Sequence, residues 1–333
     1  MTELAARVPC TVVTGFLGAG KTTLIRHVLE NAGGRRLAVL VNEFGDIGID
    51  GEILKGCGIE SCPEENIVEL SNGCICCTVA DDFLPTIQKL LDRADPPEHI
   101  VIETSGLALP KPLVQAFAWP EIRARVTVDG VIAVVDAPSA AAGEFPEVPG
   151  PHDEPLTEVF ADQLACADLV VVNKIDQLDE PGLAALEREI ARRARPGAKR
   201  LRARHGAIDP AILLGLRAEA EDDLATRPSH ADAEGAHDHD DFESFALTLP
   251  PIAAPDALAE RLRRTIEAHE VLRVKGFLDV PGKAMRLALQ AVGPRLERWF
   301  DRPWRADEAR LSRLVVIGRK GLDRAAIAAA IAG

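Results

Sequence analysis

The chain has 333 residues, a length typical of two domains, and 47% of them are hydrophobic, enough for a sizeable core. Its 52 acidic residues outnumber its 38 lysines and arginines, so the formal net charge is −14 and the bulk surface should repel nucleic acids and anionic membranes. No segment approaches the roughly 18 consecutive apolar residues of a membrane span, and the N-terminal segment is unlike a signal peptide. The composition therefore predicts a cytoplasmic protein that binds neither nucleic acid nor membrane.

Apolar runs rich in β-branched residues alternate with helical patterns through the first two-thirds of the chain. Strands are expected at 11–14, 37–41, 100–103, 126–136 and 169–173. Helices are expected at 21–30 and near 83–93, 112–119, 156–166 and 181–194. Alternation of this kind predicts an α/β fold, a mostly parallel sheet with helices on both faces, whose ligands bind beyond the carboxyl ends of the strands.

An acidic stretch separates this region from the rest of the chain. Residues 222–241 are polar, lack apolar periodicity and carry His230, His237 and His239, so they are expected to form a linker whose histidines are either incidental or loosely metal-binding. Beyond it, strands are expected at 245–249, 271–277, 285–291 and 311–317, and helices near 255–268 and 321–331. The predicted organisation is a first domain over 1–221, the linker, and a small α+β domain over 242–333.

A phosphate-binding loop follows the first expected strand. Residues 15–22 read GFLGAGKT, which fits the pattern G-x-x-x-x-G-K-[ST] between a strand and a helix, as in P-loop NTPases. The glycines let backbone N–H groups surround phosphate oxygens, the lysine neutralises the β- and γ-phosphates, and the first threonine can hold Mg²⁺. The candidate nucleotide ligands here are Gly15, Gly18, Ala19, Gly20, Lys21, Thr22 and Thr23.

A second motif points to guanine as the base. Residues 173–176 read NKID directly after the strand at 169–173. Asp176 can accept hydrogen bonds from the guanine N1 and N2 groups, and Asn173 can bond the O6/N7 edge. Adenine lacks that pair of donors, so Asn173, Lys174 and Asp176 favour GTP over ATP as the ligand.

Carboxylates and small residues follow two other strands. In ETSG at 103–106, Glu103 is placed to support Mg²⁺ or its water, and Ser105 and Gly106 to approach the γ-phosphate. In NEFGD at 42–46, Glu43 and Asp46 could touch Mg²⁺ or orient the attacking water, or act only as helix caps. The candidate catalytic residues are Lys21, Glu43, Asp46 and Glu103, and the sequence leaves the carboxylate that drives hydrolysis open.

Five of the seven cysteines fall in one short segment. Cys74, Cys76 and Cys77 lie within GCICC at 73–77, with Cys57 and Cys62 as less specific candidates. Three thiolates on an irregular loop could converge on one ion, and thiolates suit Zn²⁺ and Co²⁺. Buried structural cysteines and a redox pair are the alternatives. The cluster therefore predicts a transition-metal site.

Together these motifs resemble the CobW family of metallochaperone GTPases. The matching segments are GFLGAGKT at 15–22, NEFGDIGID at 42–50, CICC at 74–77, ETSGLA at 103–108 and NKID at 173–176. Within 271–293 and 301–304 the sequence is similar to the branch associated with cobalamin synthesis. The resemblance implies that Cys74, Cys76 and Cys77 bind Co²⁺ most tightly in the Mg²⁺-GTP form. It also implies delivery to the cobaltochelatase of aerobic cobalamin synthesis.

The resulting hypothesis is GTP-gated delivery of a metal ion. GTP with Mg²⁺ would order the cysteine loop, and hydrolysis would release the metal to an acceptor protein. The alternatives are a zinc-delivery GTPase of the same family, a metal-buffering protein with a structural nucleotide site, and a translation or signalling GTPase without metal. A homodimer is left open.

Overall fold

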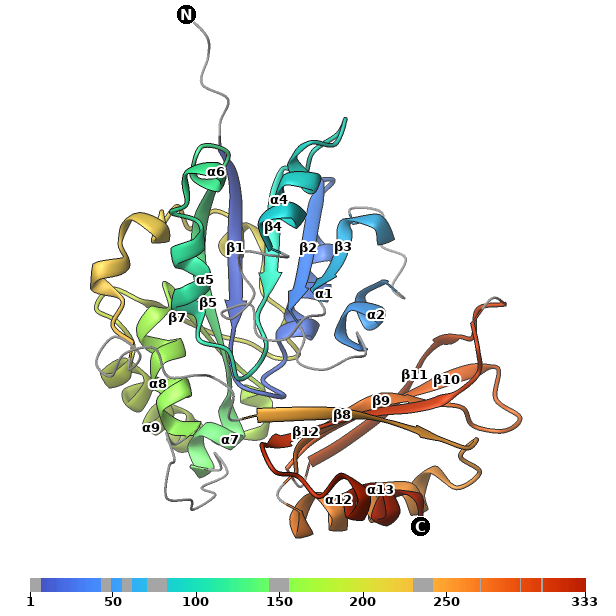
Figure 1. Cartoon of the computed structure of the whole chain (residues 1–333). Coiled ribbons are helices and arrows are strands. Elements are labelled where there is room, and N and C mark those ends of the chain that lie inside the picture. The colour runs from blue at the N-terminus through green and yellow to red at the C-terminus, as the bar shows by residue number, and fades with distance from the viewer. Residues whose placement is uncertain are drawn as a thin grey trace, which may run out of the picture. The chain divides into compact units, whose positions relative to one another are not determined.

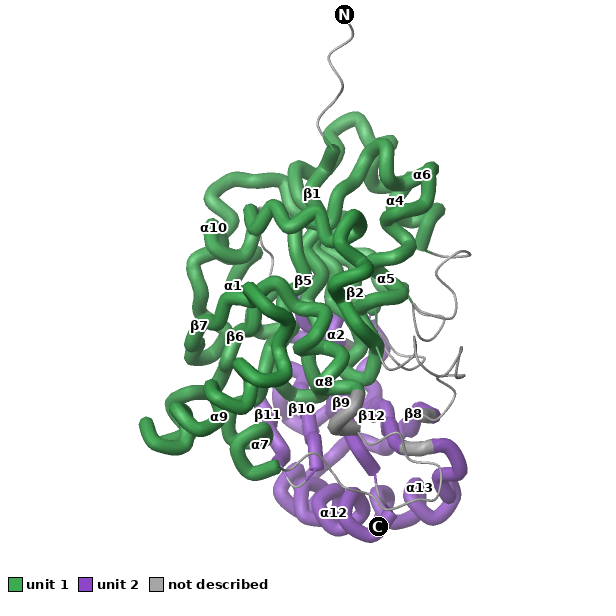
Figure 2. The backbone as a smooth tube through the Cα atoms, turned by 90° about the vertical axis from the view of Figure 1, so that its left-hand side faces the viewer, with its two compact units in different colours: residues 1–42, 57–237 green, residues 43–56, 238–333 purple. Residues whose placement is uncertain are grey.

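The computed structural model describes residues 7–42, 49–55, 62–70, 83–143, 156–229, 242–269, 271–293, 295–306 and 308–333. Contacts within the chain divide it into two units, shown in green and purple in Figure 2. The first unit comprises residues 1–42 and 57–237, and the second comprises residues 43–56 and 238–333. Within the described residues, no helix combines the length and the apolar character that a membrane crossing requires.

The first unit is built on a seven-stranded sheet in which every described pair of neighbouring strands is parallel (Figure 1). The strand order is β3-β2-β4-β1-β5-β6-β7, and the α/β fold expected from the sequence is confirmed. The inner strands are buried along their length, which explains their continuous valine, leucine and isoleucine runs. The strands are β1 (Val8–Thr14), β2 (Leu37–Asn42), β3 (Ile67–Leu70), β4 (His99–Glu103), β5 (Val126–Asp136), β6 (Leu169–Asn173) and β7 (Lys199–Arg202).

Helices connect these strands and cover the sheet with apolar side chains. Helices α4, α5 and α6 share one core cluster with β1, β2 and β4, in which Phe83 and Phe117 meet edge to face, with ring centroids 5.4 Å apart. Helices α8 and α9 pack against β5 and β6. The helices are α1 (Lys21–Glu30), α4 (Leu84–Leu91), α5 (Pro110–Ala116), α6 (Pro120–Arg123), α7 (Ala137–Ala142), α8 (Leu156–Cys166), α9 (Glu180–Arg193) and α10 (Pro210–Leu213).

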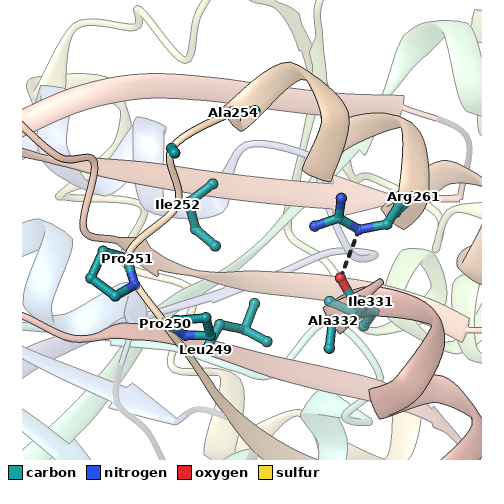
Figure 3. Close-up of a pocket in the computed structure, with 9 residues that line it drawn as sticks. Leu249, Pro250, Pro251, Ile252, Ala254, Arg261, Ile331 and Ala332 are labelled. Carbon is teal, nitrogen blue, oxygen red and sulfur yellow. Dashed lines mark hydrogen bonds between the residues drawn. The ribbon is translucent and has the colours of Figure 1, made fainter.

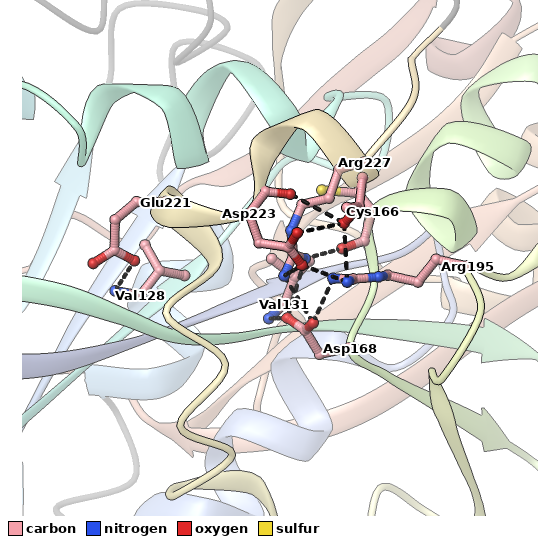
Figure 4. A network of polar contacts seen from close by, with 9 residues as sticks. Val128, Val131, Cys166, Asp168, Arg195, Glu221, Asp223 and Arg227 are labelled. Atoms are coloured by element: carbon pink, nitrogen blue, oxygen red, sulfur yellow. Dashed lines mark hydrogen bonds and ion pairs between the residues drawn. The ribbon is translucent and has the colours of Figure 1, made fainter.

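A buried arginine ties the last segment of this unit to the sheet. Arg227 is completely buried, and its guanidinium donates to the Cys166 carbonyl and to both carboxylate oxygens of Asp168 (Figure 4). Asp168 also accepts from Arg195 at 2.9 Å and from the backbone of Val131 at 2.9 Å. Burial raises the pKa of the Cys166 thiol to about 11, so this cysteine is a neutral core residue.

A second buried polar group lies inside the sheet. His99 is 4% exposed, and its Nε2 lies 2.8 Å from the Thr11 hydroxyl. Asp129 accepts backbone hydrogen bonds from residues 215–217 at 2.7–3.0 Å. Burial lowers the pKa of His99 to about 4, although the Asp129 carboxylate opposes this shift. The imidazole is therefore neutral in the folded protein at neutral pH.

This histidine is expected to make the first unit sensitive to acid. The unfolded chain has an ordinary histidine pKa of about 6.5, so between about pH 6.5 and pH 4 it binds a proton that the folded protein does not. Stability should fall by about 3 kcal/mol as the pH drops through this window, at 1.36 kcal/mol per pH unit. Urea unfolding of the native protein and of a His99→Gln variant checks this. An equal pH slope in both would contradict the assignment.

The second unit contains a five-stranded sheet in which every described strand pair is antiparallel. The strand order is β11-β10-β9-β12-β8, and α12 and α13 supply apolar side chains to one core with these strands, which confirms the expected α+β class. The elements are β8 (Phe242–Leu249), α12 (Pro255–Ala268), β9 (Val271–Leu278), β10 (Met285–Val292), β11 (Arg295–Pro303), β12 (Ser312–Arg319) and α13 (Arg324–Ala332).

The two helices of this unit are joined beside a small cavity. Arg261 on α12 donates from Nε to the Ile331 carbonyl of α13 at 2.9 Å (Figure 3). The adjoining cavity has a volume of about 160 Å³, and the residues that line it include Leu249, Pro250, Pro251, Ile252 and Ala332. The hydrogen bond therefore fixes the two helices to each other at the edge of the core.

Helix α2 (Ile49–Lys55) also belongs to this unit, an assignment that sequence order does not suggest. Asp50 is 5% exposed, and its carboxylate oxygens lie 3.4 Å from Arg273 Nη2 and 3.2 Å from Lys275 Nζ. Both cations stand on β9 and are themselves buried. The helix is thus attached to the sheet by buried ion pairs.

Glu52, two residues further along α2, adds a second set of ion pairs. Its Oε2 lies 3.5 Å from Arg286 Nη1 and 3.3 Å from Arg302 Nη2. The Arg286 guanidinium lies 3.5 Å from the ring centroid of Phe277, and Glu308 accepts from both arginines. Charged side chains on β9, β10 and β11 thereby bind one short helix.

Candidate nucleotide site

The loop that follows β1 has the backbone that the glycine pattern predicts. Gly15 has a φ of 138°, and a Cβ there would lie 2.2 Å from the Val134 carbonyl oxygen. Gly20, the residue before α1, has a φ of 100°. Neither position accepts a larger residue without strain. The loop therefore opens directly into the N-terminus of α1, where helix N–H groups favour an anion.

Lys21 is held within this loop. Its side chain is 5% exposed, and Nζ donates to the carbonyls of Gly15 at 2.8 Å and Phe16 at 3.3 Å. The ammonium group consequently lies against the same backbone that would surround a phosphate. Thr22 and Thr23 follow in the first turn of α1.

Thr22 and Glu103, the two residues expected to lie near Mg²⁺, contact each other next to the phosphate-binding loop. The Thr22 hydroxyl donates to Glu103 Oε1 at 2.9 Å, and Glu103 is 3% exposed at the end of β4. A hydroxyl and a carboxylate are the hard oxygen donors that Mg²⁺ prefers. The residues present therefore fit a magnesium ion, which would be held by Thr22 and by Glu103 directly or through water.

The turn after β4 lies against the phosphate-binding loop. The Thr104 hydroxyl donates to the Thr14 hydroxyl at 3.0 Å. A Cβ on Gly106 would lie 2.5 Å from Leu17 Cδ2 and 2.7 Å from the Leu17 backbone nitrogen. Ser105 is 8% exposed between them. The ETSG segment thus places Ser105 and Gly106 beside the phosphate-binding loop.

Asn173 links the loops instead of standing open to a base. Its Nδ2 donates to the Ala19 carbonyl at 2.9 Å, and its Oδ1 accepts from the Gly206 backbone at 3.0 Å. The side chain is 2% exposed. It therefore joins the phosphate-binding loop, the end of β6 and the segment after β7 in one rigid arrangement.

The other residues of the NKID motif lie at the same edge. Lys174 has a φ of 62°, and its Nζ lies 3.0 Å from Asp136 Oδ2 at the end of β5. Asp176 is exposed in the 3₁₀ turn Ile175–Gln177. This carboxylate is accessible to a base, while the lysine is fixed by its partner.

The segment after β7 is a part of the site that the sequence did not reveal. His205 and Gly206 have φ values of 51° and 67°, and a Cβ on Gly206 would lie 2.8 Å from the Leu24 Cα of α1. Their backbone adjoins Asn173 at the expected guanine end. The only local signal was the His-Gly pair, which carries little information because β7 was not expected.

Several predicted residues lie outside the described part of the chain. These are Glu43, Asp46, Cys57, Cys74, Cys76, Cys77 and the linker histidines His230, His237 and His239. Within the described part, no group of three His, Cys, Asp or Glu side chains suits a metal ion. Cys62 is described, but burial raises the pKa of its thiol to about 12, which disfavours the thiolate that a metal needs.

Comparisons with known proteins extend over both units. Residues 9–202 match the profile "CobW/HypB/UreG, nucleotide-binding domain", and residues 242–333 match "Cobalamin synthesis protein cobW C-terminal domain". The zinc chaperone CobW of Sinorhizobium sp is 52% identical over 98% of this chain and 96% of its own length. The zinc chaperone CobW of Pseudomonas aeruginosa is 54% identical over 97% of this chain and 90% of its own length.

A more distant relative is named as a GTPase. The zinc-regulated GTPase metalloprotein activator 1 of Schizosaccharomyces pombe is 38% identical over 55% of this chain and 43% of its own length. The resemblance drawn from the sequence motifs is confirmed by these matches. The chain belongs to the CobW/HypB/UreG family of GTPases, with a nucleotide-binding domain followed by a CobW C-terminal domain.

Proposed function

We propose that this GTPase is a metallochaperone that delivers Zn²⁺ to an acceptor protein under the control of GTP hydrolysis. The observation that carries the proposal is the meeting of Lys21, the Thr22–Glu103 pair and the loops joined by Asn173 at one edge of the sheet. This arrangement suits a nucleoside triphosphate with Mg²⁺.

The choice of metal rests on the relatives and on ligand chemistry. Two relatives above 50% identity are named zinc chaperones, which supports the zinc alternative over delivery of Co²⁺ to a cobaltochelatase. Most protein sites bind Zn²⁺ more tightly than Co²⁺. A set of thiolates alone would therefore not select cobalt. We assign Cys74, Cys76 and Cys77 as the zinc ligands because three thiolates are a typical zinc donor set.

The order of the chain suggests how nucleotide and metal are coupled. The segment 71–82, which contains the three cysteines, connects β3 to α4. Strand β3 ends at the same edge of the parallel sheet as β1, where the phosphate-binding loop begins. GTP would then favour the metal-binding arrangement, and loss of the γ-phosphate would release the ion. By linkage, zinc should tighten GTP binding by the factor by which GTP tightens zinc binding.

The catalytic assignment follows from the same contacts. Lys21 would neutralise the β- and γ-phosphates. Glu103 already accepts a hydrogen bond from Thr22, so we assign it to the support of Mg²⁺ and leave the orientation of water to Glu43 or Asp46. Asp176, which is exposed, would select guanine, while Asn173 would hold together the loops on either side of the base.

Metal competition tests the proposal. Zn²⁺ and Co²⁺ affinities are measured with buffered free metal in the presence of Mg²⁺ with a non-hydrolysable GTP analogue, and again with GDP. We expect zinc to bind at least about tenfold more tightly with the analogue, within the usual 1–3 kcal/mol of coupling. Equal zinc affinities in the two states would rule out gated delivery and favour metal buffering.

Two sets of variants separate the alternatives. Cys76→Ser with Cys77→Ser should abolish zinc binding, and Cys10→Ser should not, because Cys10 is a buried core residue with a raised pKa. Retention of the nucleotide-dependent zinc affinity after loss of Cys76 and Cys77 would refute this ligand assignment. Tighter binding of Co²⁺ than of Zn²⁺ with the GTP analogue would restore the cobalt alternative.

A further inference from the structure

A buried glutamine on α8 contacts the turn that lies over the phosphate-binding loop. Gln163 is 1% exposed, and its Nε2 donates to the Gly106 carbonyl at 3.2 Å and to the Ala108 carbonyl at 3.3 Å. Both acceptors belong to the segment that follows Glu103. A helix 55 to 57 residues away in the chain thus holds this turn by its backbone.

The contact requires the two donors of a primary amide. The two N–H groups of Gln163 are each matched to one carbonyl, and this pair of acceptors fixes which end of the amide is nitrogen. The Oε1 atom is buried and has no hydrogen-bond partner among the described residues. An unsatisfied buried oxygen lowers stability, so the side chain is not placed for stability alone.

The turn itself has little freedom at the point where it is held. The Ala108 backbone donates to the Ser105 carbonyl at 3.1 Å, which closes the turn. Gly106 lies so close to Leu17 that a Cβ would overlap its backbone nitrogen. A shift of the Gly106 carbonyl would therefore move this backbone relative to the phosphate-binding loop.

We propose that Gln163 is a positioning residue for GTP hydrolysis. Its amide holds the turn from Ser105 to Ala108 so that the Gly106 backbone stays beside the phosphate-binding loop, where a γ-phosphate would bind. Helix α8 therefore restrains the turn beside the phosphate-binding loop. The strand that follows it, β6, ends in Asn173 at the expected guanine end of the site. This role concerns the hydrolysis step and does not depend on which metal the protein carries.

Steady-state kinetics of a Gln163→Leu variant test the proposal, with Gln115→Leu, an exposed glutamine on α5, as the matched control. Loss of two hydrogen bonds that matter for the reacting geometry should lower kcat about tenfold. The KM for GTP and the Kd for GDP should change less than about threefold, because the lysine and guanine contacts remain. The control should retain the native kcat.

A Gln163→Glu variant adds a readout that a structural role would not move. Its carboxylate has no donor for the two carbonyls, whereas the protonated acid supplies one, and burial raises the pKa of such an acid. The kcat of this variant, relative to the native protein, should therefore rise as the pH is lowered from 8 to 6. An unchanged kcat in Gln163→Leu overturns the proposal. So does a pH-independent ratio for Gln163→Glu, or a parallel loss of GDP affinity and melting temperature in both variants.

Discussion

Replacement of Lys21 by alanine is expected to lower kcat for GTP hydrolysis by about 10²-fold or more, the usual loss when a group that stabilises transition-state charge is removed. The ammonium group lies against the carbonyls of Gly15 and Phe16, inside the loop that would surround the phosphates. Phosphate release from GTP under saturating conditions measures the loss.

The guanine side should remain largely intact in this variant. Asn173 would still donate to Ala19 and accept from Gly206. The affinity for GDP should therefore fall by a smaller factor than kcat does. Lys89→Ala, a lysine exposed on α4, is the matched control and should hydrolyse GTP at the native rate. Native turnover in Lys21→Ala would contradict the placement of the triphosphate in this loop.

The elements that the sequence predicted well have either a buried, continuous apolar run or a motif that marks their boundary. The expected helix at 21–30 and the strands at 126–136 and 169–173 coincide with α1, β5 and β6. Parallel strands buried on both faces produce such runs, and the Gly20–Lys21 boundary is marked by the phosphate-binding motif.

The edge strands β3, β7 and β11 escaped prediction for a physical reason, whereas the edge strand β8 was expected in part, at 245–249. Strand β7 reads KRLR and is mostly exposed at the end of its sheet, so it needs no apolar alternation. Strand β11 is one edge of the second sheet and reads RLERWFDRP, in which charged residues outnumber apolar ones. Strand β3 has only four residues. Each of these strands pairs with only one adjacent strand. The sequence of the edge strand itself does not show which strand that is.

The candidate site could be predicted as motifs but not as a network. The spacing within 15–22 and 173–176 points to phosphates and guanine, because each motif acts within a few residues. The Asn173 contacts with Ala19 and Gly206 and the Gln163 contacts with the turn after β4 join segments far apart in the chain. Single-sequence reasoning contains no signal for such pairs, since each side chain is also an ordinary polar residue.

The second large effect concerns stability: Asp50→Asn is expected to destabilise the second unit by about 3–5 kcal/mol. The change keeps the side-chain shape and removes the negative charge that faces Arg273 and Lys275. Both cations are buried, at 6% and 1% exposure, so water cannot replace the lost carboxylate at little cost. The free energy of unfolding of the second unit should therefore fall, even though the carboxylate belongs to one short helix, α2.

Tryptophan fluorescence can report on this unit separately. Trp299 lies on β11 and Trp304 follows it, whereas Trp119 belongs to the first unit. In a Trp119→Phe background, urea unfolding followed by fluorescence gives the stability of the second unit with and without Asp50→Asn.

A matched aspartate distinguishes burial from charge. Asp256 pairs with Arg298 at 2.7 Å, but its side chain is 94% exposed, so Asp256→Asn should lower stability by less than about 1 kcal/mol. Both substitutions remove one carboxylate from an ion pair in the same unit, and only the first leaves buried cations behind. Equal losses would mean that water reaches Arg273 and Lys275. The attachment of α2 would then depend on its apolar contacts instead of on Asp50.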